Sequence, residues 1–140
     1  MTTRSKKMTS LAAAAGLAAS LGSATPALAK SQAWKSESGC TGRVSIEAID
    51  GRVYGAAAFS PCLASKVPSG RRFYVVVSED GIRQNFDVKS FYSFTSDNYI
   101  YKAADPVSIS VPYKPNRKYK ACVMIASNYV NGAEFGCINK

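Results

Sequence analysis

The chain has 140 residues, with 18 Lys and Arg against 9 Asp and Glu, four Cys, one Trp and no His. This length allows one domain besides a processed leader, and a hydrophobic content of 46% is enough for a packed core. The absence of His excludes Ser-His-Asp and Cys-His catalysis, His-containing zinc sites and His-based acid–base chemistry.

Residues 1–29 have the pattern of a secretory signal peptide. Three basic residues precede a run of Ala and Leu over residues 11–21, and residues 27–29 read Ala-Leu-Ala, which fits a cleavage site. The apolar run is shorter than the about 20 residues that span a bilayer. We therefore expect a secreted, extracellular product that begins near Lys30 and has no stable membrane insertion. After removal of the leader the chain still has a net positive charge, which favours anionic partners such as cell-surface polymers.

Residues 30–39 form a polar segment with one large aromatic residue, Trp34. This composition predicts a flexible N-terminal arm. Trp34 could fold back onto a sheet face. It could instead be an anchor that enters a partner's pocket, as Trp often is in protein interfaces. We take Trp34 and the neighbouring Lys35 as candidate partner-binding residues.

We place the folded domain over residues 40–140. Its first predicted element is a β-hairpin formed by residues 44–49 and 52–59. The first segment alternates apolar and polar residues, and an Asp-Gly pair between the two segments is a strong two-residue turn signal. In the register of that turn, Cys40 and Cys62 lie one residue from direct opposition. A small bulge would therefore allow a disulfide between them.

Residues 71–79 and 82–88 predict a second hairpin around another Asp-Gly turn. Its register places Val75 opposite Phe86, on an apolar face shared with the next cross-strand pair. Further short strands are indicated between turn and proline signals, over residues 99–101, 107–111, 118–126 and 133–138. About seven to eight short strands and no helical period indicate an all-β fold, a small antiparallel β-sandwich or barrel.

Four Cys in an exported chain without a CxxC pair indicate two disulfides. The first hairpin favours Cys40–Cys62, and a loop over residues 127–132 would place Cys122 opposite Cys137 as the second pair. The rival pairing, Cys40–Cys137 with Cys62–Cys122, would join the chain ends instead. The wide spacings disfavour a four-thiolate metal site, so we expect no metal and no cofactor.

Residues 115–119, Pro-Asn-Arg-Lys-Tyr, lead into the predicted strand of Cys122. This loop-then-Tyr pattern resembles immunoglobulin-like and fibronectin-like domains. Tyr119 precedes Cys122 by three positions instead of two, the disulfide spacing of immunoglobulin domains is missing, and we expect no equivalent of their buried Trp. The resemblance implies a sandwich architecture and no family membership.

The acidic residues lie mostly at predicted turns or in the arm, and no carboxylate pair is singled out for glycoside cleavage. We therefore expect no catalytic residues and a protein that is not an enzyme. No nucleic-acid-binding module is recognisable, so we expect no nucleic-acid partner. Tyrosines among basic residues suit sugars, anionic polymers and protein partners, and we add Tyr99, Tyr101 and Lys102 to the partner-binding candidates.

Together these features predict a secreted, non-enzymatic binding protein. The leading interpretation is an adaptor or accessory subunit of an extracellular protein assembly, for example a secreted bacterial toxin complex, which docks through its N-terminal arm. One alternative is an inhibitor of secreted proteases or glycosidases, with residues 61–66 as the inhibitory loop. Another is a toxin or lectin that binds cell walls through Tyr and Lys side chains.

Overall fold

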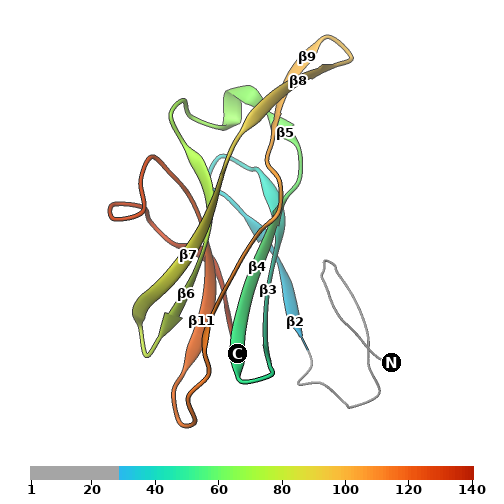
Figure 1. The fold of residues 1–140 in the computed structure, drawn as a ribbon. Helices are drawn as coiled ribbons and strands as arrows, with labels where there is room; N and C mark the ends of the chain where they lie inside the picture. Colours follow the sequence, from blue (N-terminus) through green and yellow to red (C-terminus); the bar gives the residue numbers. More distant parts are fainter. Residues whose placement is uncertain (1–28) are drawn as a thin grey trace.

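The computed structural model describes residues 29–140 (Figure 1). The predicted signal peptide lies outside these residues, apart from Ala29. The described part is built from eleven β-strands and one short 3₁₀ turn. Within it, no helix has the length and apolar character needed to cross a membrane. The prediction of an all-β fold is confirmed.

Two four-stranded antiparallel sheets form a sandwich. The first sheet has the order β10 (Val107–Pro112), β4 (Arg52–Phe59), β3 (Thr41–Ile49) and β2 (Lys30–Lys35). The second has the order β12 (Phe135–Asn139), β11 (Tyr119–Ala126), β6 (Arg72–Glu79) and β7 (Ile82–Ser90). A small third sheet contains β5 (Cys62–Leu63), β9 (Tyr99–Ala103) and β8 (Tyr92–Ser96), and its β8–β9 hairpin extends beyond one end of the sandwich (Figure 1).

The core lies between the two larger sheets. Because successive side chains of a strand point to opposite faces, alternate residues of β3, β4 and β6 meet there. The most deeply buried include Val44, Ile46, Val53, Val75 and Val77, each with 1% or less of its surface exposed. Tyr119, which is 3% exposed, closes one end of the core. Its hydroxyl accepts a hydrogen bond from the Lys114 backbone N–H and donates to the Pro112 carbonyl.

The first predicted hairpin and both disulfides are confirmed. Asp50 and Gly51 adopt positive φ values of 51° and 75°, as a type I′ turn requires, and β3 pairs with β4 in the predicted register. Cys40 is bonded to Cys62 and Cys122 to Cys137, so no described cysteine is free. The rival pairing of the four cysteines is thereby excluded.

The register predicted for the second hairpin is wrong beyond its turn. Gln84 has no partner in β6, and this bulge places Phe86 opposite Val76 instead of Val75. One extra residue moves every later side chain to the other face of the strand. Phe86 therefore packs on the outer face of the second sheet, in a cluster with Tyr74 and Met124.

Residues 127–134 form a loop that folds over this outer cluster, two residues longer than predicted. Tyr129 stacks on Phe86 with ring centroids 4.0 Å apart. The guanidinium of Arg83 donates hydrogen bonds to the carbonyls of Tyr129 and Gly132 and pairs with Glu134. Strand β6 is consequently buried on both faces.

The prediction of a flexible arm is wrong for residues 30–35. They form β2, which pairs with β3 along its full length. Trp34 is only 3% exposed, and its indole N–H donates to the Arg43 carbonyl at 3.1 Å. A Cβ on Gly42 would lie within 2.3 Å of the indole ring, so the glycine makes room for it. An edge strand with one face toward solvent needs few apolar residues. For this reason the composition of β2 is as polar as that of a flexible arm.

Candidate functional site

The β8–β9 hairpin is largely exposed to solvent. Its two-residue turn consists of Asp97 and Asn98, with φ values of 51° and 69°, which Asp and Asn tolerate better than other non-glycine residues. Ser96 lies opposite Tyr99, and Phe94 lies opposite Tyr101. All five residues of β8 are exposed. Neither larger sheet therefore covers this strand.

Four aromatic side chains share one face of the hairpin, because cross-strand partners and residues two apart point the same way. They are Tyr92, Phe94, Tyr99 and Tyr101, and we call them the aromatic face. Tyr92 is 52% exposed and Tyr99 is 60% exposed. The rings of Phe94 and Tyr101 stack with centroids 5.5 Å apart. The face is thus a pre-arranged apolar surface with hydroxyl groups at its margin.

The base of the hairpin is held firmly. Phe91, which precedes β8, packs on Phe59 of the core with ring centroids 4.8 Å apart. Strand β5 pairs with β9, placing Cys62 opposite Lys102, and the disulfide from Cys62 to Cys40 ties β5 to the start of β3. A supported base lowers the conformational entropy that the hairpin would lose when it binds.

The structure brings together three of the five candidate partner-binding residues. Tyr99 and Tyr101 lie on the aromatic face, and Lys102 is on the opposite face of the same strand. Trp34 does not join them, because it is buried in the core. Lys35 is exposed at the end of β2, a strand that pairs with β3 and not with the hairpin strands.

Two residues of the aromatic face were not among the selected candidates, Tyr92 and Phe94. Their signal was present in the sequence: apolar and hydroxyl residues alternate from Tyr92 to Thr95, shortly before the Asp-Asn turn. Exposure could not be inferred from that alternation, because a half-buried strand has the same pattern.

Residues 61–66, the candidate inhibitory loop, are built into the base of the hairpin. Leu63 lies opposite Tyr101 in the small sheet, and Ala64–Lys66 form the 3₁₀ turn η1. The Lys66 carbonyl accepts a hydrogen bond from the Ser38 hydroxyl at 2.6 Å. The segment therefore supports β9 and is not displayed as an isolated extended loop.

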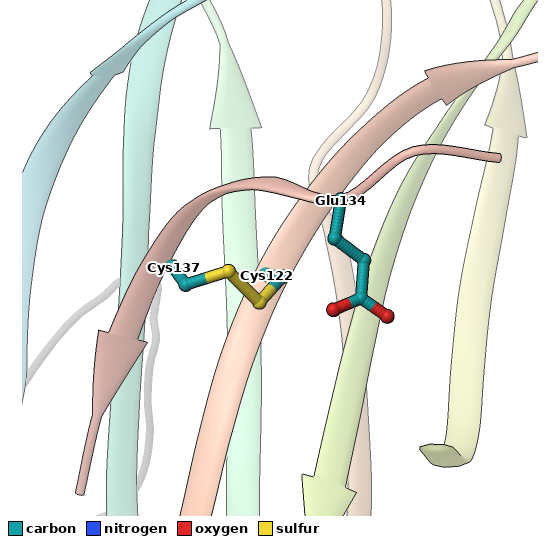
Figure 2. A group of neighbouring side chains, drawn as sticks. All are labelled: Cys122, Glu134 and Cys137. Atoms are coloured by element: carbon teal, nitrogen blue, oxygen red, sulfur yellow. A yellow bond between two sulfur atoms is a disulfide. The ribbon is translucent and has the colours of Figure 1, made fainter. Parts of the chain in front are cut away.

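Cys122, Glu134 and Cys137 lie close enough together to suggest a metal site (Figure 2). The two sulfur atoms are bonded to each other, however, and a disulfide has no thiolate to offer a metal ion. Glu134 is paired with Arg83. The group thus anchors the 127–134 loop, and its chemistry is structural.

Basic residues at the opposite end of the sandwich are partly neutralised. Arg117 bonds the Asp80 carboxylate at 2.9 Å, and Lys114 lies 3.7 Å from the Glu79 carboxylate. Hydrogen bonds from the Lys118 backbone N–H and from Arg117 lower the pKa of Asp80, so this carboxylate stays ionised, and paired with Arg117, to a lower pH than an ordinary Asp. This end is therefore a weaker candidate for an anionic polymer than its lysine count implies.

Comparisons of the chain with known protein families, curated proteins and solved structures find no match. Two disulfides are consistent with an extracellular protein, because such bonds persist in oxidising compartments. The aromatic face and its supported base are the features on which a function can be argued.

Proposed function

We propose that this protein is secreted and acts by binding, as an adaptor or accessory subunit of an extracellular assembly that docks through the aromatic face of the β8–β9 hairpin. The observation that carries this proposal is the exposure of that face. Tyr92 and Tyr99 are more than half exposed, on a hairpin that projects beyond the sandwich (Figure 1). Grouped apolar side chains on a soluble protein commonly mark an interaction site.

The composition of the face favours a protein partner. Tyr is enriched among the residues that dominate interface energetics, since its ring gives a large contact area at a low cost in side-chain entropy. Stacking of Phe94 on Tyr101 already fixes two of the rings. The hairpin thus takes the docking role that the sequence suggested for the N-terminal arm, whose Trp34 is committed to the core.

A paired substitution tests the proposal. The double variant Tyr99→Ser with Tyr101→Ser removes two rings from the aromatic face, and Tyr54→Ser with Tyr113→Ser removes two partly exposed rings elsewhere. Immobilised wild type and variants are incubated with native culture fluid, and bound proteins are quantified by mass spectrometry. We expect the Tyr99/Tyr101 variant to bind the captured partner about 30-fold to 700-fold more weakly, given about 1–2 kcal/mol for each interface Tyr.

The Tyr54/Tyr113 control is expected to retain the partner. Thermal unfolding of both variants establishes that each is folded at the temperature of the assay. Equal recovery of the same partners by the wild type and the Tyr99/Tyr101 variant would contradict the proposal.

A further inference from the structure

The outer edge of β8 is unpaired. This strand lies at the end of its sheet, with β9 on one side and no described strand on the other. In a hairpin with a two-residue turn, Ser96 and Tyr99 form a hydrogen-bonded pair, and so does every second pair from there, including Phe94 with Tyr101. The backbone N–H and C=O groups of Ser93 and Thr95 therefore point away from β9.

This edge lacks the features by which proteins usually block further strand pairing. Its sequence, Tyr-Ser-Phe-Thr-Ser, contains no charge, no Pro and no Gly. Both edges of the first sheet differ. Strand β10 ends in Pro112, and its Ser108 N–H donates to the Asp87 carboxylate. Strand β2 carries Lys at both ends, and Gln32 donates to the Cys137 carbonyl of β12.

We propose that this edge pairs with the same edge of a second copy of the chain. The two β8 strands run antiparallel about a two-fold axis at Phe94, so that Ser93 of one copy lies opposite Thr95 of the other. The outward-facing groups of these two residues then form hydrogen-bonded pairs, and Phe94 faces its symmetry mate in a non-hydrogen-bonded pair. Among the symmetric pairings that join these groups, this register matches all five residues of β8.

The charges around β8 are compatible with such a pair, although the protein as a whole is basic. No like charges face each other along the strand, because β8 has none.

The consequence is a four-stranded sheet with the order β9, β8, β8, β9 and one continuous aromatic surface. Edge pairing leaves the aromatic face open, so the second copy doubles the docking surface. A contact of this length is smaller than a standard interface, and we expect a weak, reversible dimer. The inference goes beyond the proposed function. Dimer formation depends on the backbone groups at the β8 edge, whereas partner binding depends on the side chains of the aromatic face. An experiment can therefore contradict one proposal and leave the other standing.

Two substitutions at Thr95 distinguish the contribution of its backbone N–H from that of its side chain. Thr95→Pro removes the outward N–H without touching a hydrogen bond to β9, and Thr95→Ala keeps that N–H. In sedimentation velocity over a concentration series, we expect wild type and Thr95→Ala to show the same monomer–dimer equilibrium. The dissociation constant of Thr95→Pro should be higher by about tenfold or more, since each dimer loses two hydrogen bonds.

A wild type that stays monomeric up to about millimolar concentration, where even the weak contacts of this size class associate, would overturn the proposal. So would dimerisation that Thr95→Pro leaves unchanged. A monomeric wild type whose partner binding depends on the Thr95 N–H would assign the edge to a strand of the partner, and would overturn the second copy as its occupant.

Cross-linking provides a second test that does not need the Pro variant to fold. Residues in a non-hydrogen-bonded pair have Cα atoms about 4.5 Å apart, within disulfide range. Under mild oxidation we expect Phe94→Cys to form a covalent dimer at least about tenfold faster than Tyr99→Cys, whose symmetry mate lies far away in this register. Equal rates for the two variants would overturn the proposed register.

Discussion

Replacement of Trp34 by Ala is expected to lower the free energy of unfolding by about 3–5 kcal/mol, the usual cost of removing a buried Trp. The indole is 3% exposed and lies 5.8 Å from the rings of both Phe59 and Phe73, measured between centroids. The substitution also leaves the Arg43 carbonyl without the indole N–H. Because small domains have about 5–15 kcal/mol of stability in total, this is a large fraction.

Urea unfolding followed by far-ultraviolet circular dichroism measures this loss without relying on Trp fluorescence. Tyr99→Ala is the matched control, because it removes a comparable ring that is 60% exposed. Its expected effect is within about 0.5 kcal/mol. A change of less than about 1 kcal/mol for Trp34→Ala would contradict the placement of this residue in the core, because buried Trp residues cost several times more.

Removal of the Cys122–Cys137 disulfide, by Ala at both positions, is expected to destabilise the fold by about 3 kcal/mol. The bridge closes a loop of 15 residues, for which the entropy of the unfolded chain accounts for an effect of this size. It also anchors the 127–134 loop over the outer cluster. Denaturant unfolding of the double variant measures the loss.

The Cys40–Cys62 bridge provides the comparison. Its removal is expected to cost a similar amount, because its sequence separation is 22 residues. This bridge supports β5 at the base of the hairpin, so its removal should also weaken partner binding, whereas removal of Cys122–Cys137 should not at temperatures where the variant is folded. Equal effects of the two variants on partner binding would contradict this support role.

Local signals predicted the parts of the fold that depend on neighbouring residues. Asp50 and Gly51 fix the first turn through their left-handed backbone, and the turn in turn fixes the register and brings Cys40 near Cys62. The Cys122–Cys137 pair could be chosen for the same reason, since a short loop places both cysteines on adjacent strands. Turn residues and the alternation of apolar and polar residues were therefore enough to predict most of the architecture.

Features set by tertiary contacts were not predictable in the same way. The bulge at Gln84 leaves no mark in the alternation of apolar residues, yet it moves Phe86 to the outer face. Strand β2 looks polar because its single core residue, Trp34, is enough to hold an edge strand. For the hairpin, the sequence identified Tyr99 and Tyr101 as candidates, but their exposure depends on β8 and β9 projecting past both sheets.

Tyrosine footprinting of the native complex tests the central claim most directly. The protein is recovered from native culture fluid with its bound partner, nitrated mildly, and compared tyrosine by tyrosine with the free protein. The aromatic face predicts that Tyr92 and Tyr99 are protected by the partner, while Tyr54 and Tyr113 react as they do in the free protein. Unchanged reactivity of Tyr92 and Tyr99 in the complex, with protection elsewhere, would contradict docking through the hairpin.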